Sequence, residues 1–188
     1  MVDNIKIYDD FLTQEELQAC ADAVKRPAWL FGQLSSQNSL TSTPFWIMML
    51  NDDTFFNTHL KSKIESITNR KFTVQRIYAN GQTFGQDSTY HQDAASDNSY
   101  TFCIYINKQI TLETVDNIGG ELTFKMPKST TPENSTDYGD TFSHIAVAPL
   151  YNRGILFPSN YFHKSFAFNR YNHGLRISIA WKFQLQPD

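Results

Sequence analysis

The sequence predicts an α+β fold in which a core of antiparallel strands, a double-stranded β-helix or jelly roll, is braced by N-terminal helices. Helical periodicity is confined to the first seventy residues, and from Phe72 onward short apolar runs alternate with turn residues. Early helices followed by strands pack as a layer on one face of a sheet. At 188 residues the chain fits a single domain. We expect a helical support in residues 1–70 and the jelly-roll core in residues 72–185.

The first helix is predicted to begin at a capping box. Thr13 and Glu16 have the required spacing, and apolar residues then recur every three or four positions until Pro27 ends the helix. A short strand, Ile5–Tyr8, precedes it. A second helix is predicted to begin at Asp52 or Asp53. Its buried face is expected to contain Phe56, Leu60, Ile64 and Ile67.

Six apolar runs bounded by turn residues predict the strands of the core. They are Phe72–Ala79, Tyr100–Asn107, Glu121–Met126, Phe142–Ala148, Gly154–Phe157 and Leu175–Leu185. Two long polar segments, Gly81–Tyr90 and Pro127–Asp140, interrupt them. Loops of this length in a compact domain are binding lids or disordered segments. The sequence leaves both interpretations open.

Composition narrows the range of functions. The net charge is −3 and cations do not cluster, whereas nucleic-acid binding needs clustered cations. No apolar run approaches the roughly 20 residues that cross a bilayer. The two cysteines, Cys20 and Cys103, form no CxxC pair and are expected to be buried and reduced. We expect a cytoplasmic protein without nucleic-acid or membrane partners, and the sequence does not fix its oligomeric state.

Three residues are candidate metal ligands. On an extended strand, residues two apart point to the same face, so the side chains of His91 and Asp93 can converge on one ion. This spacing alone is weak evidence, because such a pair also forms ordinary surface hydrogen bonds. A third ligand has to come from another strand, and His163 follows the apolar run Ile155–Phe157.

Alternation along the last predicted strand separates a bulky face from a small one. The bulky face suits the core and contains Ile177, Ile179, Trp181 and Phe183. On the other face, Ser178 and Ala180 leave space in front of Arg176. A guanidinium facing such space binds a carboxylate through its two-pronged geometry. Because no acidic residue stands at a matching position on that face, we expect the ligand of Arg176 to be a dicarboxylic acid.

Four motifs follow one another in the chain: His91-x-Asp93, Gly119-Gly120-Glu121-Leu122, His163 and Gly174-Leu175-Arg176-Ile177-Ser178. In this order they resemble 2-oxoglutarate/Fe(II)-dependent dioxygenases of the prolyl 4-hydroxylase type, over about residues 72–183. The resemblance implies that His91, Asp93 and His163 bind Fe(II) and that Arg176 binds the distal carboxylate of 2-oxoglutarate. Two histidines and one carboxylate leave open positions for co-substrate and oxygen. Ascorbate is the expected reductant in vitro.

The resemblance also implies roles for two tyrosines. Tyr105 corresponds to a family tyrosine whose hydroxyl meets the same carboxylate as the arginine, and Tyr78 to one that lines the co-substrate pocket. Either could instead be an ordinary half-buried aromatic residue. The implied reaction is hydroxylation of a C–H bond with release of succinate and carbon dioxide. Related halogenases have a small residue at the position of Asp93, so a carboxylate there favours hydroxylation.

The sequence departs from the family pattern in the interval between His163 and Arg176, which is longer than expected. An insertion at residues 168–173 would explain it, but it leaves Arg170 and Lys164 as rivals for the anion. The stretch between Tyr78 and His91 is also a few residues longer than the family pattern.

Three other functions remain to be weighed: a nucleic-acid demethylase on the same scaffold, a non-oxidative cupin-type metalloprotein, and a binding module with an accidental metal motif. The substrate is expected to be a peptidyl proline or a small molecule. Residues that select it are expected in Trp29–Pro44, Gly81–Tyr90 and Pro127–Asp140.

Overall fold

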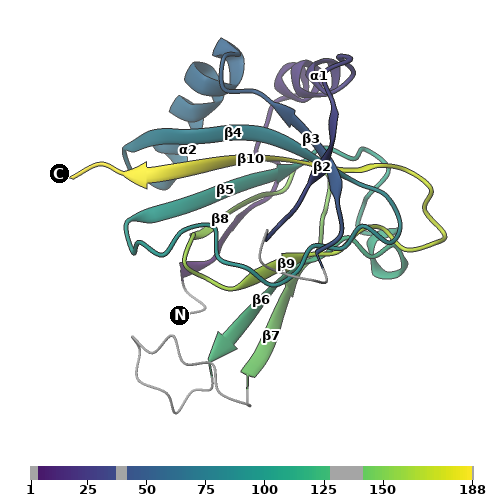
Figure 1. The fold of residues 1–188 in the computed structure, drawn as a ribbon. Helices are drawn as coiled ribbons and strands as arrows, with labels where there is room; N and C mark the ends of the chain where they lie inside the picture. The colour runs from purple at the N-terminus through teal and green to yellow at the C-terminus, as the bar shows by residue number, and fades with distance from the viewer. Residues whose placement is uncertain (1–3, 37–41, 128–141, 188) are drawn as a thin grey trace.

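The computed structural model describes residues 4–36, 42–127 and 142–187. Within these residues, ten strands form two antiparallel sheets (Figure 1). The larger sheet has the order β1-β8-β5-β10-β4-β3-β2, and the smaller has the order β7-β6-β9. The strand bounds are β1 Lys6–Tyr8, β2 Leu30–Gln33, β3 Phe45–Met49, β4 Phe72–Gln82, β5 Ser99–Tyr105, β6 Leu122–Pro127, β7 Phe142–Val147, β8 Gly154–Pro158, β9 His163–Ser165 and β10 Arg176–Leu185.

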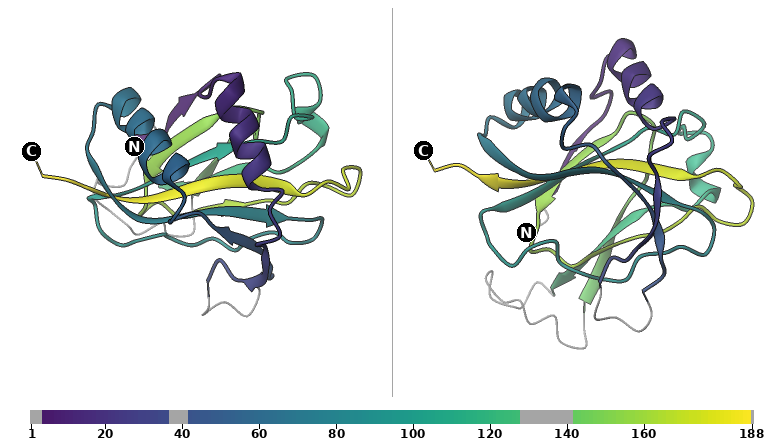
Figure 2. Two further views of the ribbon diagram at one scale, coloured as in Figure 1. Left: turned by 90° about the horizontal axis from the view of Figure 1, so that it is seen from above. Right: turned by 45° about the horizontal axis from the view of Figure 1, so that its top comes forward.

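The sheets face each other and the helices cover the outer face of the larger one. Figures 1 and 2 show helices α1 (Gln14–Ala23) and α2 (Lys61–Thr68) on one side of β4 and β10, with β6, β7 and β9 on the other. This layered jelly roll confirms the predicted fold class. None of the helices within the described residues has the length and apolarity that a membrane span requires.

The first helix begins as predicted. Thr13 accepts a hydrogen bond from the amide of Glu16, whose carboxylate accepts one from the amide of Thr13 at 2.8 Å. This exchange satisfies two amides that a helix start would otherwise leave unpaired. Leu17 and Cys20 are buried against the sheet. The helix lies on the outer face because its apolar residues recur along one side.

The second helical segment combines two kinds of helix. Asp53 caps it by accepting a hydrogen bond from the amide of Phe55 at 3.0 Å, in agreement with one of the two predicted starts. A π-helical turn, η2 (Phe55–Leu60), precedes α2. Three of the four predicted core residues are fully buried, but the prediction for Ile67 was wrong, since it is 46% exposed. The wider π turn changes the register of the residues that follow it.

Alternation along β10 sends its bulky residues into one core, as the sequence predicts, while its other face borders a second hydrophobic core that the sequence did not predict. Ile179, Trp181 and Phe183 belong to the core between the helices and the larger sheet, where the Trp181 indole donates a hydrogen bond to the carbonyl of Phe56. Ala180 faces the other way. It lies in the core between the two sheets, together with Cys103, Tyr105, Leu122, Phe124, Ile155 and Phe157.

All six predicted core strands are present, with ends that differ by up to three residues. Strands β2, β3 and β9 were not predicted. Residues 1–70 therefore contribute three strands, β1, β2 and β3, to the larger sheet as well as helices. Of the two predicted loops, residues 128–140 lie outside the described residues. The other begins later than expected, because β4 continues to Gln82.

Candidate metal centre

His91 and His163 are paired across two neighbouring segments. Each donates its backbone amide to the carbonyl of the other, with both N···O distances at 3.0 Å. Their side chains lie on the same side, with ring centroids 4.4 Å apart. His163 begins β9, whereas His91 forms only an isolated bridge, so the extended strand expected at His91 is reduced to one paired residue.

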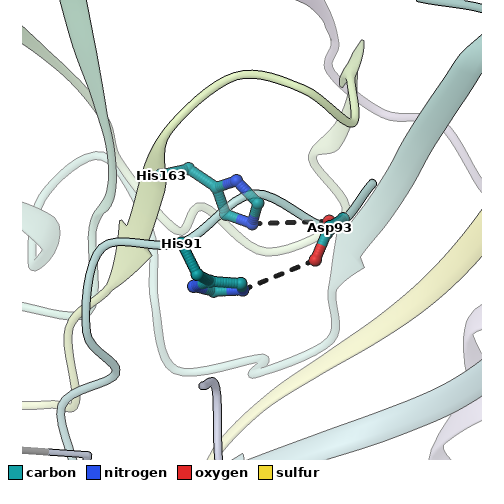
Figure 3. A group of neighbouring side chains, drawn as sticks. All are labelled: His91, Asp93 and His163. Carbon is teal, nitrogen blue, oxygen red and sulfur yellow. Dashed lines mark ion pairs between the residues drawn. The ribbon is translucent and has the colours of Figure 1, made fainter. Parts of the chain in front are cut away.

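Asp93 completes a compact group with the two histidines. Its backbone amide donates to the carbonyl of Ser159 at 2.8 Å, which turns the carboxylate toward the two rings. Oδ1 is 3.4 Å from Nε2 of His91, and Oδ2 is 3.4 Å from Nε2 of His163 (Figure 3). One ligand atom from each residue lies within 4.8 Å of the others. The structure thus brings together the three residues that the sequence predicts as ligands.

Backbone carbonyls hold both imidazole rings in one tautomer. Nδ1 of His91 is 2.8 Å from the carbonyl oxygen of Thr89, and Nδ1 of His163 is 2.9 Å from that of Tyr161. A carbonyl only accepts, so each Nδ1 carries the hydrogen and, in a neutral ring, the lone pair of Nε2 points at Asp93. This is the usual arrangement for a histidine that binds a metal through Nε2.

Burial and charge determine the protonation of this group. Burial lowers the pKa of His163 to about 4, so its ring is neutral at neutral pH. Burial alone would raise the pKa of Asp93, but the Lys182 ammonium beside it outweighs burial and holds that pKa well below its ordinary value. A carboxylate and two imidazole nitrogens that converge on one point suit a cation between them. The donor set of two imidazoles and one carboxylate fits a divalent transition metal.

The spacing of the ligand atoms also fits such an ion. In an octahedral site with bonds of about 2.1 Å, neighbouring ligand atoms are about 3 Å apart. The two nitrogen–oxygen distances of 3.4 Å need only a small contraction to reach that geometry. Three ligands on one side of the ion leave further positions toward the cavity.

Lys182 is a member of the site that the sequence interpretation missed. Its ammonium contacts Oδ2 of Asp93, and the hydroxyl of Thr101 donates to the same oxygen at 2.7 Å. Both contacts restrain the carboxylate. The signal was present in the sequence, because the alternation that places Arg176, Ser178 and Ala180 on one face of β10 continues to Lys182.

Arg176 is buried in the same cavity, with 2% of its surface exposed. Its Nε donates to the carbonyl of Gly120 at 2.8 Å, and one terminal nitrogen donates to Oε1 of Gln82 at 2.9 Å. Gly120 belongs to the predicted Gly-Gly motif and has a φ of +89°, a conformation that favours glycine. The rival cations lie elsewhere: Arg170 is exposed beside Tyr171, and Lys164 does not line the cavity.

A buried hydroxyl without a partner lies beside Arg176. The guanidinium is 5.1 Å from the ring of Tyr105, whose hydroxyl has no hydrogen-bond partner among the described residues. Burial raises the pKa of Tyr105, which keeps this hydroxyl a neutral donor. The side-chain oxygen of Asn80, which lines the same cavity, is also unpaired. Unsatisfied buried polar groups of this kind are costly and point to a missing ligand.

Inward-facing side chains of three adjacent strands line the cavity, which has a volume of about 310 Å³. The register of β4, β10 and β5 sets them in four rows across the sheet. From one end of the cavity to the other, the rows are Gln82 and Arg176; Asn80, Ser178 and Tyr105; Tyr78, Ala180 and Cys103; and Arg76, Lys182 and Thr101. Tyr78 is buried among them. Its row is farther from Arg176 than that of Tyr105, and its predicted role at the co-substrate stays a prediction.

The fold is that of 2-oxoglutarate/Fe(II) oxygenases. An oxidoreductase of the 2OG-Fe(II) oxygenase family from Burkholderia pseudomallei superposes with a TM-score of 0.67 at 12% identity, covering 96% of this chain and 85% of the other. A prolyl-4-hydroxylase from Pseudomonas putida gives a TM-score of 0.65 at 14% identity, covering 98% and 94%.

A third solved structure of this fold contains ligands. HygX from Streptomyces hygroscopicus, with nickel, 2-oxoglutarate and hygromycin B bound, has a TM-score of 0.64 at 9% identity and covers 96% of this chain and 82% of its own. No protein-family model and no curated protein sequence matches the chain. The likeness is therefore one of fold.

Proposed function

We propose that the protein is an Fe(II)- and 2-oxoglutarate-dependent oxygenase that hydroxylates a C–H bond and releases succinate and carbon dioxide. One observation carries this proposal. A His-Asp-His group and a buried arginine beside an unpaired tyrosine hydroxyl line the same cavity. A cupin-type metalloprotein without a dicarboxylic co-substrate has no need for the arginine and the hydroxyl. Solved structures with this fold include one with nickel and 2-oxoglutarate bound, which supports the proposal.

His91, Asp93 and His163 would hold the metal. Iron(II) bound there, together with 2-oxoglutarate, supplies the chemistry that activates dioxygen for oxidation of a C–H bond. The chain contributes geometry: the carbonyls of Thr89 and Tyr161 keep Nε2 of each histidine available, and Lys182 restrains the carboxylate. Burial of His163 and partial burial of His91 and Asp93 limit the access of bulk water to the reacting atoms.

Arg176 and Tyr105 would bind the distal carboxylate of 2-oxoglutarate. The guanidinium already uses donors on Gly120 and Gln82, which fixes its orientation before the ligand arrives. Its remaining donors and the Tyr105 hydroxyl can then meet the two carboxylate oxygens. Preorganised donors of this kind lose little entropy on binding, so orientation of the co-substrate costs little.

The test of the proposed function is conversion of 2-oxoglutarate to succinate with Fe(II) and ascorbate. Asp93→Ala and His163→Ala should each abolish both substrate-stimulated and uncoupled conversion, because each removes a metal ligand. His173→Ala removes an exposed histidine outside the triad and serves as the matched control. Full turnover in Asp93→Ala would refute the assignment. Metal binding by the wild type without any succinate would favour a non-oxidative metalloprotein.

A further inference from the structure

The charges that line the cavity are unbalanced. Arg76, Arg176 and Lys182 are positive, and Asp93 is the one acidic side chain among the lining residues that the structure describes. A divalent metal and the dianion of 2-oxoglutarate cancel each other, so the proposed cofactors leave the surplus of two positive charges unchanged. Like charges gathered around one cavity repel one another, and an anion among them relieves that repulsion. The surplus therefore favours an anion as the remaining occupant of the cavity.

Two of the three cations already have defined partners. Lys182 contacts the Asp93 carboxylate and the Thr101 hydroxyl. Arg176 is fixed by a carbonyl and an amide oxygen at the end of the cavity where the co-substrate is proposed to bind.

Arg76 differs from these two because it pairs with no carboxylate in the described part of the chain. Its guanidinium carbon lies 4.5 Å from the ring centroid of Tyr78, and one terminal nitrogen lies 3.7 Å from the sulfur of Met49, a weak acceptor. A guanidinium stacked on an aromatic ring uses its flat face and keeps its N–H donors at the edge. Those donors form a fork suited to a carboxylate or a phosphate.

The position of Arg76 is suitable for a substrate group. In the register of β4 and β10, Arg76 pairs with Lys182, whereas Gln82 pairs with Arg176 at the opposite end of the cavity. The Lys182 ammonium is 5.7 Å from the Tyr78 ring centroid and contacts Asp93. An anion held by Arg76 would therefore lie within the length of a small molecule from the metal ligands and would leave the co-substrate end free.

We propose that the substrate is a small organic anion whose carboxylate or phosphate binds Arg76, at the end of the cavity opposite Arg176. This inference rests on the proposed function and narrows its substrate class. The cavity of about 310 Å³ is at the low end of ligand pockets, which span roughly 300–1,000 Å³, and 2-oxoglutarate has to share it. That size favours a small molecule over a peptide.

The test measures the melting temperature of the full chain, loaded with Mn(II) and 2-oxoglutarate, in the presence of candidate anions. The probes are matched pairs: N-acetyl amino acids with their neutral amides, and glycerol 3-phosphate with glycerol. At least one anion should raise the melting temperature where its neutral partner does not. Arg76→Gln should weaken binding of that anion by about ten- to a hundredfold, the loss expected for a charge-assisted hydrogen bond. Arg76→Lys should retain part of the affinity.

The matched control is Arg170→Gln, which removes an exposed arginine outside the cavity and should bind the anion like the wild type. The acid–amide pairs test for a carboxylate on the substrate, and the phosphate pair tests for a phosphate. Three results would overturn the inference: stabilisation by acid and amide alike, stabilisation by no anion of either arm, or equal binding by Arg76→Gln. Failure of Mn(II) and 2-oxoglutarate themselves to stabilise the wild type would instead count against the proposed function, so the two failures are distinguishable.

Discussion

At the scale of single residues, Arg176 is a fully buried charge on the cavity wall. Burial of a guanidinium is costly unless its donors are satisfied. The Gly120 carbonyl and Gln82 satisfy part of them, and the neighbouring Tyr105 hydroxyl has no partner. The arrangement is incomplete within the described residues and would be completed by a carboxylate.

Replacement of the Arg176 guanidinium by a lysine ammonium should weaken binding of 2-oxoglutarate. We expect Arg176→Lys to raise the KM for 2-oxoglutarate by about tenfold or more, because an ammonium cannot make two parallel hydrogen bonds to one carboxylate. Steady-state kinetics with varied 2-oxoglutarate measures this. Arg170→Lys, on the surface, should leave KM unchanged. An unchanged KM in Arg176→Lys, with a raised KM in Arg170→Lys, would move the role to Arg170.

The candidate site could be predicted from sequence to the extent that it depends on local spacing. Two-residue spacing indicated His91 and Asp93, and alternation indicated Arg176. The contact between Lys182 and Asp93 could not be predicted in the same way, because it joins residues 89 positions apart. Partner choice across a sheet depends on register, which a single sequence does not display.

At the scale of elements, Glu16 ties α1 to the second helical segment. Its carboxylate completes the capping box at Thr13 and also contacts the ammonium of Lys63 and Nε2 of His59, the latter at 2.7 Å. Burial alone would raise the pKa of Glu16, but Lys63, the Thr13 amide and His59 together lower it. The ionised carboxylate therefore stabilises the folded state.

Loss of this carboxylate should destabilise the fold in a pH-dependent manner. We expect Glu16→Gln to reduce the free energy of unfolding by about 1–3 kcal/mol at neutral pH. A lowered folded-state pKa means that the contribution is present above the ordinary glutamate pKa, about 4.3, and is lost as pH falls through the folded value. Urea unfolding at several pH values measures the difference, which should shrink in acid. Glu113→Gln, an exposed acid, is the control, and a difference that grows in acid would contradict this account.

Elements whose apolar residues recur with a clear period could be predicted from the sequence, and elements without such a period could not. The capping box and the alternation in β10 specify their structures locally. Strand β3, with sequence FWIMM, is apolar at every position and has no alternation, and β9 has only three residues. Their positions depend on pairing with β4 and β6, which are distant in sequence.

At the scale of the molecule, two cores fix the walls of one cavity. The core beneath the helices holds the outer face of β4, β5 and β10, and the core between the sheets surrounds the inner face. Because packed interiors tolerate little displacement, the rows of inward side chains are held in register. The arrangement sets Arg176 and the metal-ligand group around a shared space before any ligand binds.

The central claim is that one cavity binds a metal and 2-oxoglutarate together. Anaerobic titration of the Fe(II)-loaded protein with 2-oxoglutarate, followed by visible absorption, tests it most directly. A saturable metal-to-ligand charge-transfer band should appear in the wild type, require metal and co-substrate together, and need more 2-oxoglutarate in Arg176→Lys. Stoichiometric Fe(II) binding with no band at saturating 2-oxoglutarate would contradict the claim.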